Sequence, residues 1–322
     1  MKIAQIQAQP GQKAFGFVKA TETHGGFDVH FPLHIVAGRR SGPTLLVVAG
    51  MSGLEIEPAL ILPQVVAEIE PAELRGTLLV VPLFNTSGFE FEQVNAVWDD
   101  RALHRLGRGA ADGTVSEQLM HCFYEEVVKY ADGVIDIRTG ALWGYFRYAG
   151  VYGTGSEVRG RALAEALGLP HAVLGAPADG SYAWEAASDG KAVVSAWIGG
   201  GPGLRDFRQE DMQRVRQAVL NGLRHLGMLD GSLERIDGPV TCVRGHNWVK
   251  LTGPRGLTFM AKEKRGQMVG AGEVIGYVKH PFTGDIAHEF RVERGGLMVH
   301  AGASWPIVPE DAILAILGDI VS

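Results

Sequence analysis

Several polar side chains follow directly on short hydrophobic runs that have the composition of buried strands. Ser52 and Glu55 come after the run at 44–50, and Arg138 lies near the end of the run at 133–140. A carboxylate and a guanidinium at neighbouring strand ends can pair or hold a charged ligand, and a serine can act as a nucleophile beside a histidine base. The other candidates of this kind are Asn85, His104, Arg105, Asp136, Tyr145, Arg147 and Trp197.

Strands and helices alternate along most of the chain, and these elements must hold the candidate side chains in place. Continuous apolar runs predict strands that are buried on both faces, and apolar residues at helical spacing predict the helices between them. This alternation is typical of an α/β protein with a mostly parallel sheet flanked by helices, in which ligands bind beyond the carboxyl ends of the strands. In chain order, the predicted strands are 44–50, 77–85, 133–140 and 191–200, and the predicted helices are 58–69, 116–131, 159–168 and 209–229.

Both ends of the chain differ from this α/β region. The first forty residues are short alternating runs broken by glycine, which predict an antiparallel β start. From about residue 235 onward the chain has short strands and glycine turns with almost no helical period, which is typical of a small β-barrel or sandwich. We therefore predict an α/β domain over 1–234 and a β domain over 235–322.

Composition and charge exclude several classes of protein. Of the 322 residues, 46% are hydrophobic and 20% are charged, which suffices for a sizeable core and excludes a mainly disordered chain. A net charge of −6 argues against a nucleic-acid partner, and two cysteines are too few for a disulfide scaffold or a thiolate zinc cluster. Because we find neither an apolar run of roughly 18 residues nor a secretory signal, we expect no membrane partner and a cytoplasmic location.

The order and spacing of several segments resemble the succinylglutamate desuccinylase/aspartoacylase family. These segments are GPTLLVVAG, PAELRGTLLVVPLFN, ADGVIDIRTG, LNGLRHLGML and the C-terminal β region, so the resemblance covers most of the chain. It implies a zinc-carboxypeptidase-like fold, hydrolysis of acyl groups from amino acids, and a C-terminal β domain that caps the site. It also implies a zinc ion held by two histidines and a glutamate, with a second glutamate as the general base.

The zinc-binding positions of the family are altered in this chain. The family motif Gly-x-His-Gly-x-Glu is GMSGLE here, with Ser52 at the histidine position and Glu55 kept. The family's Asp-Leu-His-Thr-Gly is DIRTG, which puts Arg138 at the second histidine position. A guanidinium is always charged and has no lone pair for a metal. We therefore expect no zinc cofactor, and we expect Arg138 to pair with Glu55 in its place.

The substrate-binding and base positions are also changed. The family's Asp-Leu-Asn-Arg is ALHR, where Arg105 is kept and His104 replaces the asparagine. Trp197 in SAWIGG stands at the position of the general base, so activation of water as in the family is not expected. We predict a metal-free, cationic pocket for a small carboxylate-bearing or acylated amino-acid-like ligand. Its expected contacts are Glu55, Asn85, His104, Arg105, Arg138, Tyr145, Arg147 and Trp197.

Two other hypotheses remain open from the sequence. An active amidohydrolase with a rearranged site would bind a metal through Glu55, His104 and Asp136, or would use Ser52 as its nucleophile. In that case the catalytic candidates are Ser52, Glu55, His104 and Arg105. A non-catalytic subunit would instead bind and regulate a zinc-bearing paralogue, and assembly into a homo-oligomer is also open.

Overall fold

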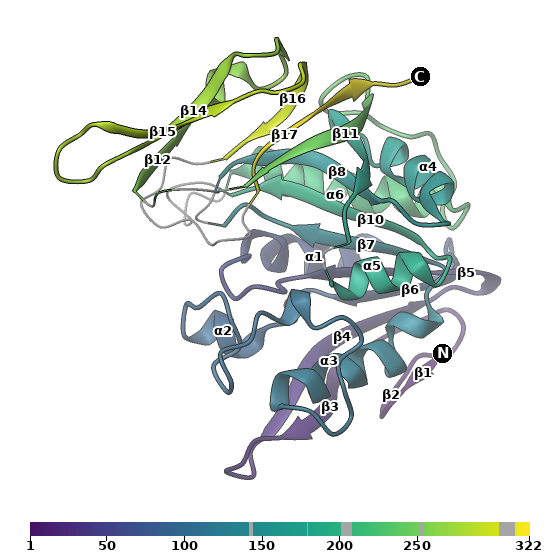
Figure 1. Cartoon of the computed structure of the whole chain (residues 1–322). Helices are drawn as coiled ribbons and strands as arrows, with labels where there is room; N and C mark the ends of the chain where they lie inside the picture. The colour runs from purple at the N-terminus through teal and green to yellow at the C-terminus, as the bar shows by residue number, and fades with distance from the viewer. Residues whose placement is uncertain (142–143, 179, 201–207, 251–253, 255, 303–312) are drawn as a thin grey trace.

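The computed structural model describes residues 1–141, 144–178, 180–200, 208–250, 254, 256–302 and 313–322. Helices and strands alternate through the middle of the chain, and the C-terminal part consists mainly of strands (Figure 1). Within these ranges, no helix is both long and apolar enough to cross a membrane. The helices are α1 (Glu57–Glu68), α2 (Thr86–Glu90), α3 (Val115–Glu126), α4 (Glu157–Leu167), α5 (Tyr182–Ser188) and α6 (Gln209–His225), with 3-10 helices η1 (Leu103–Arg105), η2 (Val128–Tyr130) and η3 (Lys262–Lys264).

In the described part of the chain, the strands form one large sheet and two small ones. In chain order they are β1 (Lys2–Ile3), β2 (Ile6–Gln7), β3 (Gln12–Glu22), β4 (Asp28–Ala37), β5 (Arg40–Ala49), β6 (Arg75–Val81), β7 (Gly133–Arg138), β8 (Phe146–Tyr152), β9 (His171–Ala176), β10 (Ala192–Gly199), β11 (Thr241–Lys250), β12 (Leu257–Met260), β13 (Met268–Val269), β14 (Val274–Lys279), β15 (Ile286–Arg291), β16 (Gly296–Ala301) and β17 (Ile313–Ile320). The large sheet has the order β13-β16-β17-β11-β9-β8-β10-β7-β5-β6-β4-β3.

The four strands predicted from apolar runs lie together at the centre of the large sheet. β6, β5, β7 and β10 are neighbours in that order, and each pair is parallel. Their carboxyl ends therefore meet at one edge, where the candidate side chains follow. Antiparallel pairs flank this centre, so the sheet as a whole is mixed.

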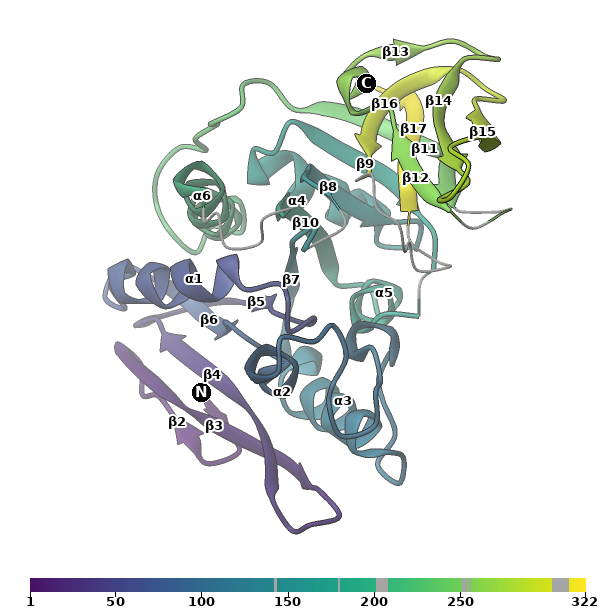
Figure 2. The same cartoon turned by 90° about the vertical axis from the view of Figure 1, so that its left-hand side faces the viewer.

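Helices cover both faces of the sheet (Figure 2). Leu45 and Val47 of β5 pack in one core with side chains of α1, α4 and α6. Leu46 and Val48 pack in the other core with side chains of α3 and α5. Because successive side chains of a strand point to opposite faces, a strand between two cores must be apolar throughout, which explains the continuous apolar run.

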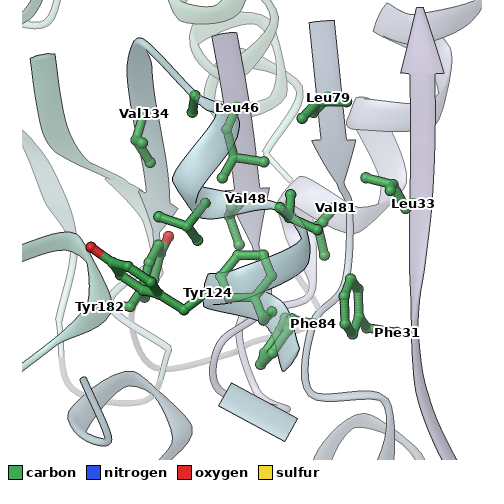
Figure 3. Close-up of a cluster of buried hydrophobic side chains, with 14 of the residues drawn as sticks. Phe31, Leu33, Leu46, Val48, Leu79, Val81, Phe84, Tyr124, Val134 and Tyr182 are labelled. Atoms are coloured by element: carbon green, nitrogen blue, oxygen red, sulfur yellow. The ribbon is translucent and has the colours of Figure 1, made fainter. Parts of the chain in front are cut away.

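Aromatic rings pack among aliphatic side chains in the core beneath α3 and α5 (Figure 3). The Phe84 and Phe123 ring centroids are 4.6 Å apart, and Phe123 meets Tyr182 edge-on at 5.2 Å. Tyr182 is fully buried, and its ring is held by this packing at the start of α5. The packing positions the Tyr182 hydroxyl beneath the strand ends.

Several predicted elements differ from the observed ones. The strand predicted over 77–85 is β6, which ends at Val81, and the helix predicted over 209–229 is α6, which ends at His225. The helix expected at 116–131 begins at Val115, because Thr114 and Glu117 form a reciprocal capping box, and it ends at Glu126 before the separate turn η2. Strands β8 and β9 and helix α5 were not predicted, because they are short and interrupted by glycine, alanine or polar residues.

The C-terminal strands continue the large sheet and also build a small one. β11 pairs in parallel with β9, and β17, β16 and β13 follow it outward. The small sheet β12-β14-β15 packs against these strands through a separate core that includes Met260, Val278, Met298 and Leu317. This arrangement is a β unit of two packed layers, and its first strand is hydrogen-bonded to the α/β sheet.

Candidate functional site

The register of the central strands places four candidate residues on one face of the sheet. Asp136 of β7 pairs with Ser195 of β10, and Arg138 pairs with Trp197. Residues that pair across strands share a face, and so do residues two apart along one strand. The four side chains therefore form two neighbouring rows on the face that α5 covers.

The turn after β5 brings Glu55 to these strand ends. A Cβ added at Gly53 would lie 2.0 Å from the Gly88 carbonyl carbon, so glycine is needed where this turn packs on α2. Glu55 Oε2 accepts a hydrogen bond from the Ser52 backbone NH at 3.0 Å, and Oε1 accepts one from Arg138 Nε at 2.9 Å. Glu55 is 2% exposed, so both carboxylate oxygens are engaged inside the protein.

Arg138 is buried between two carboxylates. Besides its bond to Glu55, its Nη1 lies 3.7 Å from Asp136 Oδ2. Burial by itself lowers the pKa of the guanidinium, but the carboxylates of Glu55 and Asp136 outweigh it and raise that pKa above its ordinary value. The predicted ion pair between Arg138 and Glu55 is thus formed, and Asp136 contributes to it from the other side.

A buried hydrogen-bond network holds Asp136. Tyr182 donates its hydroxyl to Asp136 Oδ1 at 2.9 Å, and Ser195 Oγ lies 3.4 Å from Oδ2. Tyr152 extends the network through a 2.9 Å contact between its hydroxyl and Ser195 Oγ. Ser195 was recognisable in the sequence as a polar residue two positions before Trp197 in an apolar strand. Tyr182 had no such signal, because it reaches Asp136 only through the packing of α5.

His104 and Arg105 lie beside this cluster. Arg105 Nε donates to His104 Nε2 at 3.1 Å, so the neutral ring must carry its proton on Nδ1. Nδ1 is buried and has no hydrogen-bond partner among the described residues. Burial, followed by the charges of Arg138 and Arg105, holds the pKa of His104 well below its ordinary value. The site therefore contains a neutral imidazole with a buried NH donor.

Ser52 and Asn85 serve the backbone of the neighbouring turns. Ser52 Oγ accepts a hydrogen bond from the Leu54 NH at 3.3 Å. Asn85 caps α2 by accepting from the Gly88 NH at 2.8 Å, and its Nδ2 donates to the Val94 carbonyl at 3.2 Å. Both side chains are buried, and these hydrogen bonds hold the local chain in place. The nucleophilic role of Ser52 and the ligand contact of Asn85 stay predictions from the sequence.

Tyr145 and Arg147 are not brought to the ion pair. The Tyr145 hydroxyl donates to Asp211 of α6 at 2.8 Å. Arg147 pairs with Ile198 in the register of β8 and β10, which places it on the face opposite Trp197. Arg147 therefore lies away from the cluster, because β8 is a strand and alternates its side chains between the two faces. Tyr145 precedes β8, and its hydroxyl is held by α6 instead.

Trp197 belongs to an aromatic layer that adjoins the ion pair. Its ring lies 5.4 Å from the Arg138 guanidinium carbon, 5.1 Å from the Phe146 ring and 6.0 Å from the nearly parallel Tyr148 ring. His300 of β16 stacks on Phe146 at 4.0 Å with an angle of 16°. The C-terminal β unit thus contacts the aromatic side of the site.

Burial of His300 makes the stability of the protein depend on pH. His300 is 1% exposed, and burial, with a smaller contribution from Arg265, lowers its pKa to about 3. The unfolded state binds the proton near pH 6.5, so this stabilisation is complete above that pH and is lost as the pH falls toward 3. We expect the free energy of unfolding to drop by about 2.5 kcal/mol at pH 4.5 through this group.

Chemical denaturation of the native protein and the His300→Phe variant at pH 7 and pH 4.5 measures this contribution. The variant keeps a ring against Phe146 but has no proton to gain, so its loss between the two pH values should be smaller by about the same 2.5 kcal/mol. Equal losses in the two proteins would show that His300 titrates normally.

Comparison with known proteins agrees with this fold and identifies the family. Residues 41–226 match the family model described as the succinylglutamate desuccinylase/aspartoacylase catalytic domain, which is more than half of the chain. The chain belongs to this family. The matched segment includes the turn with Glu55, the strand end with Arg138 and the strand with Trp197.

Individual relatives of the family cover nearly the whole chain. N-alpha-acetyl-L-2,4-diaminobutyric acid deacetylase of Halomonas elongata is 26% identical over 286 residues, which are 84% of this chain and 80% of that protein. The structure of a succinylglutamate desuccinylase/aspartoacylase from Rhodobacter sphaeroides covers 100% of both chains with a TM-score of 0.84 at 21% identity. The product-bound ectoine utilization protein EutE (DoeB) from Ruegeria pomeroyi covers 99% of this chain and 100% of its own with a TM-score of 0.81 at 21% identity.

The zinc ion implied by the family resemblance does not fit the side chains at these positions. Arg138 places a positively charged Nε 2.9 Å from Glu55, and this charge would repel a divalent cation at the same carboxylate. No three His, Cys, Asp or Glu side chains in the described ranges come together as a metal site requires, so Glu55, His104 and Asp136 do not form the alternative site.

Proposed function

We propose that this member of the deacylase family binds a small, carboxylate-bearing or acylated amino-acid-like ligand in a metal-free site, without the family's zinc-dependent hydrolysis. The buried Arg138–Glu55 pair carries this proposal. A guanidinium keeps a fixed positive charge where the family has a metal ion, but it cannot lower the pKa of a bound water as a metal does.

Two side chains beside the ion pair, Arg105 and His104, could bind the charged and polar groups of such a ligand. Arg105 is exposed and carries a positive charge at the edge of the site, where it can bind a carboxylate. His104 Nδ1 is a buried NH donor that an amide carbonyl oxygen would satisfy. Arg138 contributes less to binding the ligand directly, because Glu55 and Asp136 already balance its charge.

The names of the relatives support the ligand class. The Halomonas elongata protein is a deacetylase of an N-acetylated diamino acid, and the Ruegeria pomeroyi protein belongs to ectoine utilization. A chain of the same fold that retains Arg105 at its family position is suited to a related molecule. A cytoplasmic location, and a second copy or a zinc-bearing paralogue as partner, stay predictions from the sequence.

Equilibrium dialysis against zinc and calorimetric titration with N-acetylglycine and N-acetyl-L-2,4-diaminobutyrate test the proposal. We expect far less than one zinc per chain, together with saturable binding of at least one N-acetylated compound. Arg105→Gln should weaken that binding about tenfold or more, because it removes a charge-assisted hydrogen bond.

Arg108→Gln is the matched control, because it removes the charge of another exposed arginine close in the sequence, one that forms ion pairs with Glu185 and Asp189. It should leave ligand affinity unchanged. One tightly bound zinc per chain that is lost in Glu55→Ala would overturn the metal-free site, and an equal effect of the two arginine variants would remove Arg105 from ligand binding.

A further inference from the structure

A surface cavity lies at the edge of the central sheet opposite to the Arg138–Glu55 pair. It forms where β5 and β6 begin, beside the last turn of α6. Because these parallel strands have their carboxyl ends at the other edge, the cavity is separate from the candidate site. Its volume is about 440 Å³, within the roughly 300–1,000 Å³ of pockets that bind small molecules. Its lining residues are Arg40, Ala72, Glu73, Arg224, Leu229 and Asp230.

Two of the four charged side chains in this lining have partners within the protein. Arg75, which pairs with Arg40 in the register of β5 and β6, donates to both carboxylate oxygens of Asp230 at 2.8 Å and 3.2 Å. Arg224 Nη1 donates to Glu234 Oε1 at 3.1 Å. The charges of Asp230 and Arg224 are therefore balanced without a ligand.

Arg40 and Glu73 differ from these two, because neither forms an ion pair with any residue of the described ranges. Both side chains are exposed. They thus present opposite charges to one cavity and are not joined to each other. A small molecule that carries both a carboxylate and an ammonium group can pair with both, and Ala72 and the half-buried Leu229 offer apolar atoms to the carbon between these groups.

We propose that this cavity binds a free amino acid, with Arg40 on its α-carboxylate and Glu73 on its α-ammonium group. A simple anion or cation would leave one of the two protein charges without a partner, so a zwitterion fits the cavity better. Because both side chains are exposed, each contact contributes modestly, and we expect an affinity in the millimolar range. The inference does not rest on the proposed function, since it uses none of the residues at the candidate site.

Calorimetric titration at pH 7 with glycine, glycinamide and acetate tests whether both charges are needed. Glycine carries both groups, whereas glycinamide lacks the carboxylate and acetate lacks the ammonium group. We expect glycine to bind about fivefold tighter than either of the other two. Arg40→Gln and Glu73→Gln should each weaken glycine binding by a similar factor.

Arg39→Gln and Glu70→Gln are the matched controls, because each neutralises an exposed side chain close in the sequence that does not line the cavity. They should leave the glycine affinity unchanged, and circular dichroism with thermal unfolding establishes that each variant is folded. The proposal is wrong if the native protein shows no saturable glycine binding, if glycinamide or acetate binds as well as glycine, or if the control variants weaken binding as much as Arg40→Gln and Glu73→Gln.

A further variant separates this cavity from the candidate site. Arg105→Gln should leave glycine binding unchanged, although it weakens the binding of N-acetylated compounds under the proposed function. A glycine affinity that falls in Arg105→Gln but not in Arg40→Gln would place glycine at the candidate site and overturn the inference. None of these glycine measurements decides whether the candidate site binds N-acyl amino acids.

Discussion

The double variant Ser52→His, Arg138→His should bind about one zinc ion per chain, whereas the native protein should bind far less. The positions flank the two oxygens of Glu55: the Ser52 NH bonds Oε2, and Arg138 Nε bonds Oε1. The exchange removes the charge that repels a cation and supplies two imidazoles next to a carboxylate, which is a ligand set of the kind zinc takes in catalytic sites.

Metal analysis after dialysis and the shift of the thermal midpoint with zinc both measure this gain. Zinc at about 100 times its dissociation constant should stabilise the variant by about 2.7 kcal/mol. Ser52→His alone is the matched control, because it adds one imidazole but keeps the Arg138 charge, and it should bind little metal. If the double variant stays metal-free, or the single variant binds as much zinc, the Arg138 charge is not what excludes the metal.

Glu55→Ala should destabilise the protein by about 3–5 kcal/mol, because it leaves the Arg138 charge buried without its nearest carboxylate. Arg138 is 6% exposed, and its remaining acidic neighbour, Asp136, is farther away at 3.7 Å. The Ser52 backbone NH also loses its acceptor. Chemical denaturation at neutral pH measures the change directly.

Two further variants separate the buried charge from other effects of the substitution. Glu22→Ala breaks an ion pair with Lys19 whose side chains are both about half exposed, and it should cost no more than about 1 kcal/mol. Glu55→Leu combined with Arg138→Met removes both charges and should recover much of the stability lost in Glu55→Ala. A cost below about 1 kcal/mol for Glu55→Ala would mean that water or another group compensates Arg138.

Much of the central sheet was predictable because its information is local. A strand between two cores needs apolar side chains on both faces, so β5, β6, β7 and β10 are continuous hydrophobic runs. The parallel arrangement then brings the ends of these strands to one edge, which is why Glu55 and Arg138 were expected to meet. β8 and β9 carry glycine, alanine or polar residues among their apolar ones, and their local pattern was too weak to predict them.

Within the site, the residue types and motif positions already indicated an ion pair in place of a metal, because an arginine cannot donate an electron pair whatever its surroundings. The residues that surround this ion pair, in contrast, are set by distant parts of the chain. Tyr182 reaches Asp136 from α5, His300 joins the aromatic layer from β16, and Arg147 is turned to the opposite face by the register of β8. Packing and register set these neighbours, and neither depends on sequence spacing alone.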